Sequence, residues 1–158
     1  MKYIYAEDIQ RIAGEISKIL FPHVKLERMK CFRSYGSSST NTVARCHTIG
    51  KLMQKAMNAE AFYALEFISE RFDNLSEEEK IKTIIHELMH IPQTFGGGFR
   101  QHDYVCEENV NICYRTYKEK KKKFDDSDVL GIQELKWKNQ DNLKSLKDIR
   151  KNAKNSFF

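Results

Sequence analysis

The chain has 158 residues, 41% of them hydrophobic and 31% charged, with a formal net charge of +5 at pH 7. This length predicts one domain with an extension and is sufficient to bury a hydrophobic core without covalent staples. No apolar run is long enough to span a membrane, and the N-terminal residues lack the apolar segment of a secretion signal. We therefore expect a cytoplasmic protein with no membrane partner.

The distribution of charge and the positions of the cysteines exclude further classes of protein. Basic and acidic residues balance over residues 1–117, so the whole positive excess lies in residues 118–158. This argues against nucleic-acid binding by the main domain and leaves the tail as a candidate electrostatic contact. The cysteines contain no C-x-x-C pair, which favours free thiols over a structural zinc knuckle. A disulfide between Cys31 and Cys46 stays open.

The first half of the chain predicts one helix followed by a small sheet. In chain order we expect a helix at 6–21, strands at 23–35 and 42–49, a short helix at 51–58 and a strand at 62–68. The last of these is ambiguous between helix and strand, and its aromatic content and short length favour a strand. As an edge strand along a cleft it could bind an extended peptide, and otherwise it is a plain core strand.

The stretch Ser76–Ile91 predicts an amphipathic helix. Ser76 and Glu79 have the spacing of a capping box, acidic residues fill the first turn, and Pro92 prevents continuation. This helix carries His86-Glu87-Leu88-Met89-His90, an H-E-x-x-H pattern. Positions four apart share one helix face, so both histidines can bind one zinc ion while Glu87 reaches a water held there.

A third ligand is expected downstream of three consecutive glycines. Gly96, Gly97 and Gly98 can turn the chain back towards the motif helix, and His102 follows them. A helix predicted at 103–118 would place His102 near its N-terminus. Two histidines from one helix, His102 and a water would make an open, catalytic type of zinc site. Glu107 or Glu108 is the alternative third ligand.

The segment after residue 118 predicts an appendage to this domain. We assign residues 1–118 to the main domain and 119–158 to a basic C-terminal extension, with a further helix at about 140–151. The extension is either a solvated tail, a contact with nucleic acid or a cover over part of the cleft.

With these motifs in place, the chain resembles the archaeal and phage family of zincin-like metallopeptidases with an H-E-x-x-H motif. The resemblance runs from about Ala44 to Tyr117 and rests on ALEFISERFDNLSEEEKIKTIIHELMHIPQTFGGGFRQHDYV. It implies an α+β fold in which a small sheet packs on the motif helix and a following helix. It also supports His102 as the third ligand. The eleven residues between His90 and His102 depart from the metzincin pattern, which has five.

These observations predict a zinc-dependent metallopeptidase that acts on a peptide or protein substrate. His86, His90 and His102 would bind Zn²⁺, and Glu87 would act as the general base on a metal-activated water. Arg100 and Tyr104 are candidate donors to the oxyanion. The alternatives are a non-catalytic metal- or protein-binding module, and a nucleic-acid-associated protease like the SprT-type enzymes, recruited by its basic tail.

Overall fold

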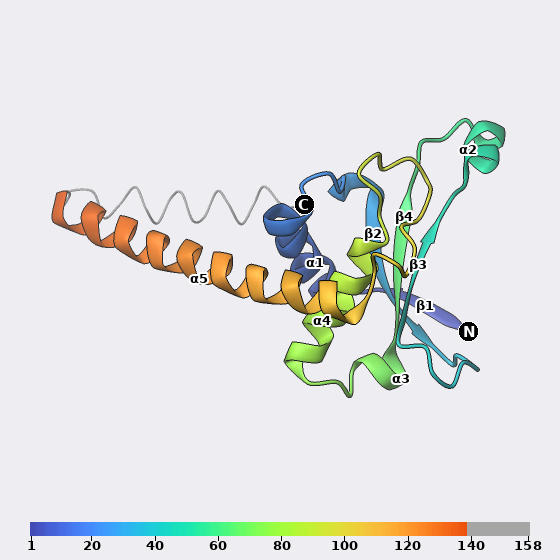
Figure 1. The fold of residues 1–158 in the computed structure, drawn as a ribbon, viewed down its shortest axis with the longest axis horizontal. Coiled ribbons are helices and arrows are strands. Elements are labelled where there is room, and N and C mark those ends of the chain that lie inside the picture. Colours follow the sequence, from blue (N-terminus) through green and yellow to red (C-terminus); the bar gives the residue numbers. More distant parts are fainter. Residues whose placement is uncertain (139–158) are drawn as a thin grey trace. The chain divides into compact units, whose positions relative to one another are not determined.

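The computed structural model describes residues 1–138, with side chains up to residue 125. The chain divides into two units, residues 1–119 and 120–158, and the features below belong to the first. Its elements run in the following order along the chain (Figure 1): β1 (Lys2–Tyr5), α1 (Glu7–Leu20), a 3-10 turn (Leu26–Arg28), β2 (Met29–Tyr35), β3 (Ala44–Thr48), α2 (Lys51–Met57), β4 (Tyr63–Ile68), α3 (Ser69–Phe72), α4 (Glu77–Met89) and α5 (Glu107–Lys138).

A four-stranded mixed sheet forms the base of the first unit, in the order β1-β2-β4-β3. β1 and β3 run antiparallel to their neighbours, whereas β2 and β4 are parallel. Parallel neighbours need a crossover connection, which β3 and α2 provide here. The α+β class expected from the sequence is confirmed.

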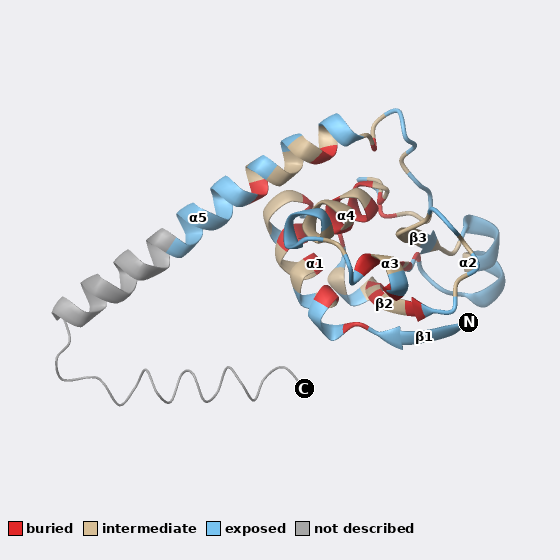
Figure 2. Ribbon diagram, turned by 90° about the horizontal axis from the view of Figure 1, so that it is seen from below, coloured by how far each residue is buried: buried red, intermediate tan, exposed pale blue. Residues whose placement is uncertain are grey.

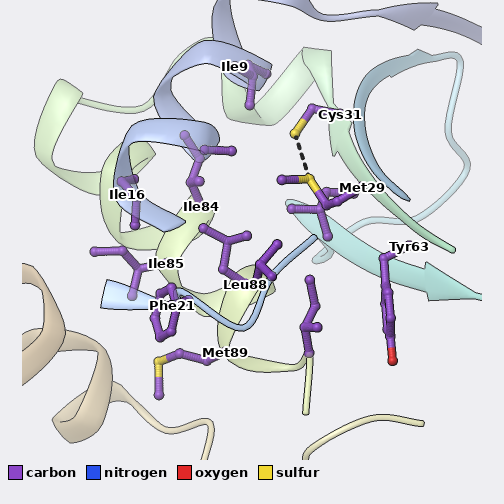
Figure 3. Packing of buried hydrophobic residues seen from close by; sticks show 14 of the residues in the cluster. Ile9, Ile16, Phe21, Met29, Cys31, Tyr63, Ile84, Ile85, Leu88 and Met89 are labelled. Carbon is purple, nitrogen blue, oxygen red and sulfur yellow. Dashed lines mark hydrogen bonds between the residues drawn. The ribbon is translucent and has the colours of Figure 1, made fainter. Parts of the chain in front are cut away.

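One face of the sheet is covered by α1 and α4, and the hydrophobic core lies between these helices and the sheet (Figures 2 and 3). Ile9 and Ile16 of α1, Ile84 and Leu88 of α4, and Leu65 of β4 belong to one buried cluster, and all five are at most 2% exposed. Burying such an aliphatic side chain contributes roughly 1.5–3 kcal/mol. The apolar face of α4 is therefore fixed against the sheet, which determines the direction in which its remaining residues point.

β4 is a central strand, and its assignment as a possible edge strand was wrong. It pairs with β2 on one side and with β3 on the other, so neither of its backbone edges is free to bind a peptide. Its side chains at Tyr63, Leu65 and Phe67 are fully buried. The strand with a free edge on this side of the sheet is β3.

Several boundaries also differ from those predicted. β2 begins at Met29 rather than residue 23, because Leu26–Arg28 form a 3-10 turn first. α5 begins at Glu107 rather than residue 103, and it continues past residue 118. β1 and α3 were not predicted, since both are only four residues long. The helix predicted at 140–151 lies outside the described residues.

The cysteines are free thiols, and the disulfide left open between Cys31 and Cys46 is absent. Both residues are register partners of Leu65 on β4, one on each flanking strand. Their Cα atoms are therefore two strand spacings apart, roughly 9–10 Å. A disulfide requires Cα atoms within about 7 Å, so this pair cannot form one.

Candidate metal centre

The helix α4 is started by the capping box that the sequence predicted. The Ser76 hydroxyl accepts a hydrogen bond from the Glu79 backbone N–H at 3.2 Å, and the Glu79 carboxylate accepts one from the Ser76 N–H at 3.1 Å. With the start of the helix fixed and its apolar face buried, His86 and Glu87 are placed at the edge of the core. His90 is the C-terminal cap residue of the same helix.

The chain after α4 returns to the end of this helix through backbone hydrogen bonds. The Arg100 N–H donates to the His90 carbonyl at 2.8 Å, and His90 Nδ1 lies 2.8 Å from the Arg100 carbonyl oxygen. A carbonyl oxygen can only accept, so His90 carries its proton on Nδ1 and leaves the lone pair of Nε2 free. This pair of bonds orients His90 as a ligand and fixes the position of the following residues.

Tyr63 anchors the glycine segment of this loop. Its buried hydroxyl donates to the Gly98 carbonyl at 2.8 Å and accepts from the Gly97 N–H at 3.0 Å. Gly97 has φ +96°, and a Cβ there would lie 2.6 Å from the Ile49 carbonyl oxygen. A side chain at this position is thus excluded both by backbone conformation and by space. This role of Tyr63 was not predicted, because its partners are 34 and 35 residues away in the sequence.

The three predicted histidines are brought together by this arrangement. One ring nitrogen from each of His86, His90 and His102 lies within 4.8 Å of the others, and the ring centroids are 5.0–5.8 Å apart. Zinc binds imidazole nitrogens at about 2.0–2.1 Å, so nitrogens this close can share one ion after small ring rotations. No other such cluster of potential ligands occurs among the described residues.

His102 reaches the cluster from a turn at residues 102–104, several residues before α5 begins. The helix predicted to follow His102 directly begins only at Glu107, so His102 precedes it by a turn, and its side chain still meets the other two. The alternative ligands Glu107 and Glu108 start α5 and do not belong to the cluster. His47 lies apart as well, because its Nε2 is 2.7 Å from a carboxylate oxygen of Glu66.

The environment of His86 and His90 favours the neutral, metal-binding form of these two histidines. Burial, together with the neighbouring His90 and His102, lowers the pKa of His86 to about 4. Burial also lowers the pKa of His90, against the effect of its hydrogen bond to the Arg100 carbonyl. Two of the three imidazoles are therefore neutral at pH 7. They can bind a metal through a free lone pair without first losing a proton.

Glu87 is a buried carboxyl group beside this cluster. It is only 5% exposed, and burial raises its pKa to about 8 from an ordinary value of 4.5. Its carboxylate has no hydrogen-bonding or ion-pairing partner among the described residues. An unpartnered buried carboxyl is costly to a fold, and such groups are concentrated at functional sites.

The destabilising effect of the buried Glu87 carboxyl group can be tested in the metal-free protein. Because the pKa is higher in the folded than in the unfolded chain, the folded state binds more protons, and stability falls as pH rises from about 4.5 through about 8. Glu87→Gln should therefore raise the free energy of unfolding of the chelator-treated protein at pH 9 by on the order of 2–4 kcal/mol. At pH 4.5 the gain should be close to zero. Urea denaturation of both proteins at the two pH values measures it, and a pH-independent difference would contradict a raised pKa.

An open cleft of about 620 Å³ adjoins the cluster on the side of His86 and Glu87. It is lined by the start of β3, by α4 and by the first turns of α5, through these residues: Thr42, Val43, Ala44, Leu75, Glu79, Lys82, Thr83, His86, Glu87, Glu107, Val110 and Asn111. A ligand in this cleft would touch both a candidate metal ligand and the unpartnered carboxyl group. The sequence motif located two of these residues, whereas the cleft walls depend on long-range packing.

The candidate oxyanion donors are engaged elsewhere. The Arg100 guanidinium stacks on the Tyr104 ring, 3.2 Å from its centroid, and both side chains line a smaller cavity to which none of the three histidines contributes. Asp103 accepts a hydrogen bond from the Tyr104 N–H at 2.9 Å, so it neither orients a histidine nor caps α5. This arrangement offers no support for an oxyanion role of Arg100 or Tyr104.

Fold and site together define an α+β domain with a candidate three-histidine metal centre on an open cleft. A family model described as "putative phage metallopeptidase" matches residues 1–130, and the chain belongs to this family. The match extends beyond the region from Ala44 to Tyr117 in which the resemblance was identified. No curated protein matches the chain, and no solved structure does. Within the described residues, no helix is both long and apolar enough to cross a membrane.

Proposed function

We propose that this protein is a zinc-dependent peptidase that hydrolyses peptide bonds with Glu87 as the general base. The observation that carries the proposal is the meeting of three imidazoles with an unpartnered, buried carboxyl group at one end of an open cleft. Membership of a metallopeptidase family supports the same conclusion. A site used only to bind a structural metal has no need of this carboxyl group, which also destabilises the fold.

Zinc is the ion that this donor set fits best. Three neutral imidazoles are typical of catalytic zinc sites, whereas calcium and magnesium prefer oxygen donors. No fourth protein ligand is found in the cluster among the described residues, which leaves a coordination position open. When bound, zinc supplies a Lewis acid that acidifies water and polarises a carbonyl group.

Glu87 is suited to both proton transfers of amide hydrolysis. Its carboxylate would accept a proton as the water oxygen attacks the carbonyl carbon, and would pass that proton to the leaving amine nitrogen as the carbon–nitrogen bond breaks. A pKa near neutrality, as burial favours here, suits a group that must both accept and release a proton.

The strand β3 supplies a means of aligning the substrate. It is a terminal strand of the sheet, and its first residue, Ala44, lines the cleft together with the preceding Thr42 and Val43. β4 occupies one edge of this strand. The Val43 carbonyl accepts a hydrogen bond from the Ile68 N–H, and the Thr42 carbonyl accepts one from the Arg71 guanidinium. The outer edge can therefore take an extended peptide by strand addition.

The proposal predicts activity that depends on the metal in a reversible way. Chelator treatment of the purified protein should abolish cleavage of an unfolded protein substrate, and addition of one equivalent of zinc should restore it. Cleavage is followed by the appearance of new amino termini, and bound zinc by elemental analysis. Zinc bound at one equivalent without cleavage of any unfolded protein or peptide library would favour the non-catalytic module instead.

A further inference from the structure

The cleft beside the metal centre combines aliphatic walls with a negative charge balance. Its apolar lining comes from three separate segments of the chain. Val43 precedes β3 and Ala44 begins it, Leu75 precedes α4, and Val110 lies in α5. Such a lining favours the hydrocarbon part of a substrate side chain. Its volume of about 620 Å³ leaves room for a long side chain.

Carboxylates outnumber cations among the cleft residues outside the metal site. Glu79 and Glu107 line the cleft together with a single cation, Lys82. Lys82 Nζ lies 2.7 Å from the Glu78 carboxylate and 5.1 Å from the centre of the Tyr114 ring, so its charge is already compensated. An incoming group therefore meets a net negative lining.

Glu107 is the carboxylate that is available to a ligand. Glu79 is held by the capping box, where it accepts hydrogen bonds from Ser76. Glu107 is exposed and makes no hydrogen bond or ion pair with another described residue. A cation that reaches Glu107 would gain an ion pair without breaking an existing one.

We propose that this cleft binds a lysine or arginine side chain next to the scissile bond, with the stem on Val43, Leu75 and Val110 and the cation at Glu107. This inference rests on the proposed peptidase function. Long basic side chains combine a hydrocarbon stem with a charged end, and they commonly bury the stem while keeping the charge in water. The cleft matches both parts, whereas an acidic side chain would be repelled.

The test compares peptides that differ at one residue adjacent to the scissile bond. Lysine, norleucine and glutamate are placed in turn on each side of the bond, because norleucine has the stem of lysine without its charge. At the preferred position, kcat/KM for lysine should exceed that for norleucine about fivefold, as for a partly exposed ion pair, and glutamate should be the poorest. Added salt should reduce the lysine-to-norleucine ratio.

Charge substitutions at Glu107 distinguish the contribution of this ion pair from effects of a substitution on folding or on overall activity. Glu107→Gln should bring the lysine-to-norleucine ratio close to one, and Glu107→Lys should bring it below one. Glu108→Lys is the matched control, since Glu108 is the next residue of α5 and does not line the cleft. It should leave the ratio unchanged. The ratio is taken within each preparation, so partial misfolding of a variant does not affect it.

The outcomes distinguish the two levels of the proposal. If zinc-loaded protein cleaves none of the peptides nor any unfolded protein, the peptidase function itself is refuted. If the norleucine peptide is cleaved as well as or better than the lysine peptide, and Glu107→Lys does not alter the ratio, the basic-side-chain site is overturned while the peptidase function stands. The cleft would then be an apolar site that selects by shape.

Discussion

Glu87→Gln is expected to lower kcat for peptide hydrolysis by roughly 10²–10⁴-fold, the usual contribution of a general base. The amide has nearly the shape of the carboxyl group but cannot accept the proton of the attacking water. The three histidines are unchanged, so the variant should bind one equivalent of zinc like the wild type. Activity on an unfolded protein and zinc content by elemental analysis are measured on the same preparation.

Glu77→Gln is the matched control for this experiment. It makes the same chemical change on the same helix, at a side chain that is 85% exposed and does not line the cleft. It should retain wild-type activity. Retained activity in Glu87→Gln would place the general base elsewhere, whereas loss of zinc together with activity would show that Glu87 supports metal binding.

His102→Ala is expected to weaken zinc binding by more than about a hundredfold, which exceeds the 10–100-fold typical of residues that only orient a ligand. With His102 removed, two histidines are left, and two protein ligands rarely retain zinc at a catalytic site. Competition with a chromophoric chelator measures the affinity. Activity at low zinc concentration should fall in parallel.

Three further variants decide between the alternative third ligands. Glu107→Gln and Glu108→Gln should bind zinc as tightly as the wild type, because neither carboxylate lies in the histidine cluster. His47→Ala, at a histidine paired with Glu66, controls for removal of an imidazole in general. A loss of affinity in one of the glutamate variants, with His102→Ala unaffected, would identify that carboxylate as the third ligand.

The motif helix could be predicted because the information that determines it is local. The capping box, the acidic first turn and the apolar spacing all lie within Ser76–Ile91, and the structure confirms the cap and the helix. The same holds for α1 and α2, whose bounds differ from the predicted ones by at most one residue. Local patterns are sufficient wherever an element is long or clearly punctuated.

Strand order and cleft walls could not be predicted, because they depend on partners far away in the sequence. Nothing within residues 62–68 distinguishes a central strand from an edge strand, since β4 is defined by the pairing of β2 and β3 on its two sides. The meeting of His102 with His86 was expected only from the glycines and the family resemblance. The hydrogen bonds that produce it, between Arg100 and His90 and between Tyr63 and the glycines, have no signature in the sequence.

The loop between His90 and His102 is secured largely through its backbone, and this has a consequence for how the protein can change over time. The groups that hold it are main-chain atoms of Arg100, Gly97 and Gly98, together with the buried ring of Phe95. The side chains that remain exposed are those of Gln93, Thr94, Phe99 and Gln101. Mutation can therefore diversify the exposed surface of this loop without displacing His102, so that new contacts can evolve, or be selected in a library, while the three histidines stay in place.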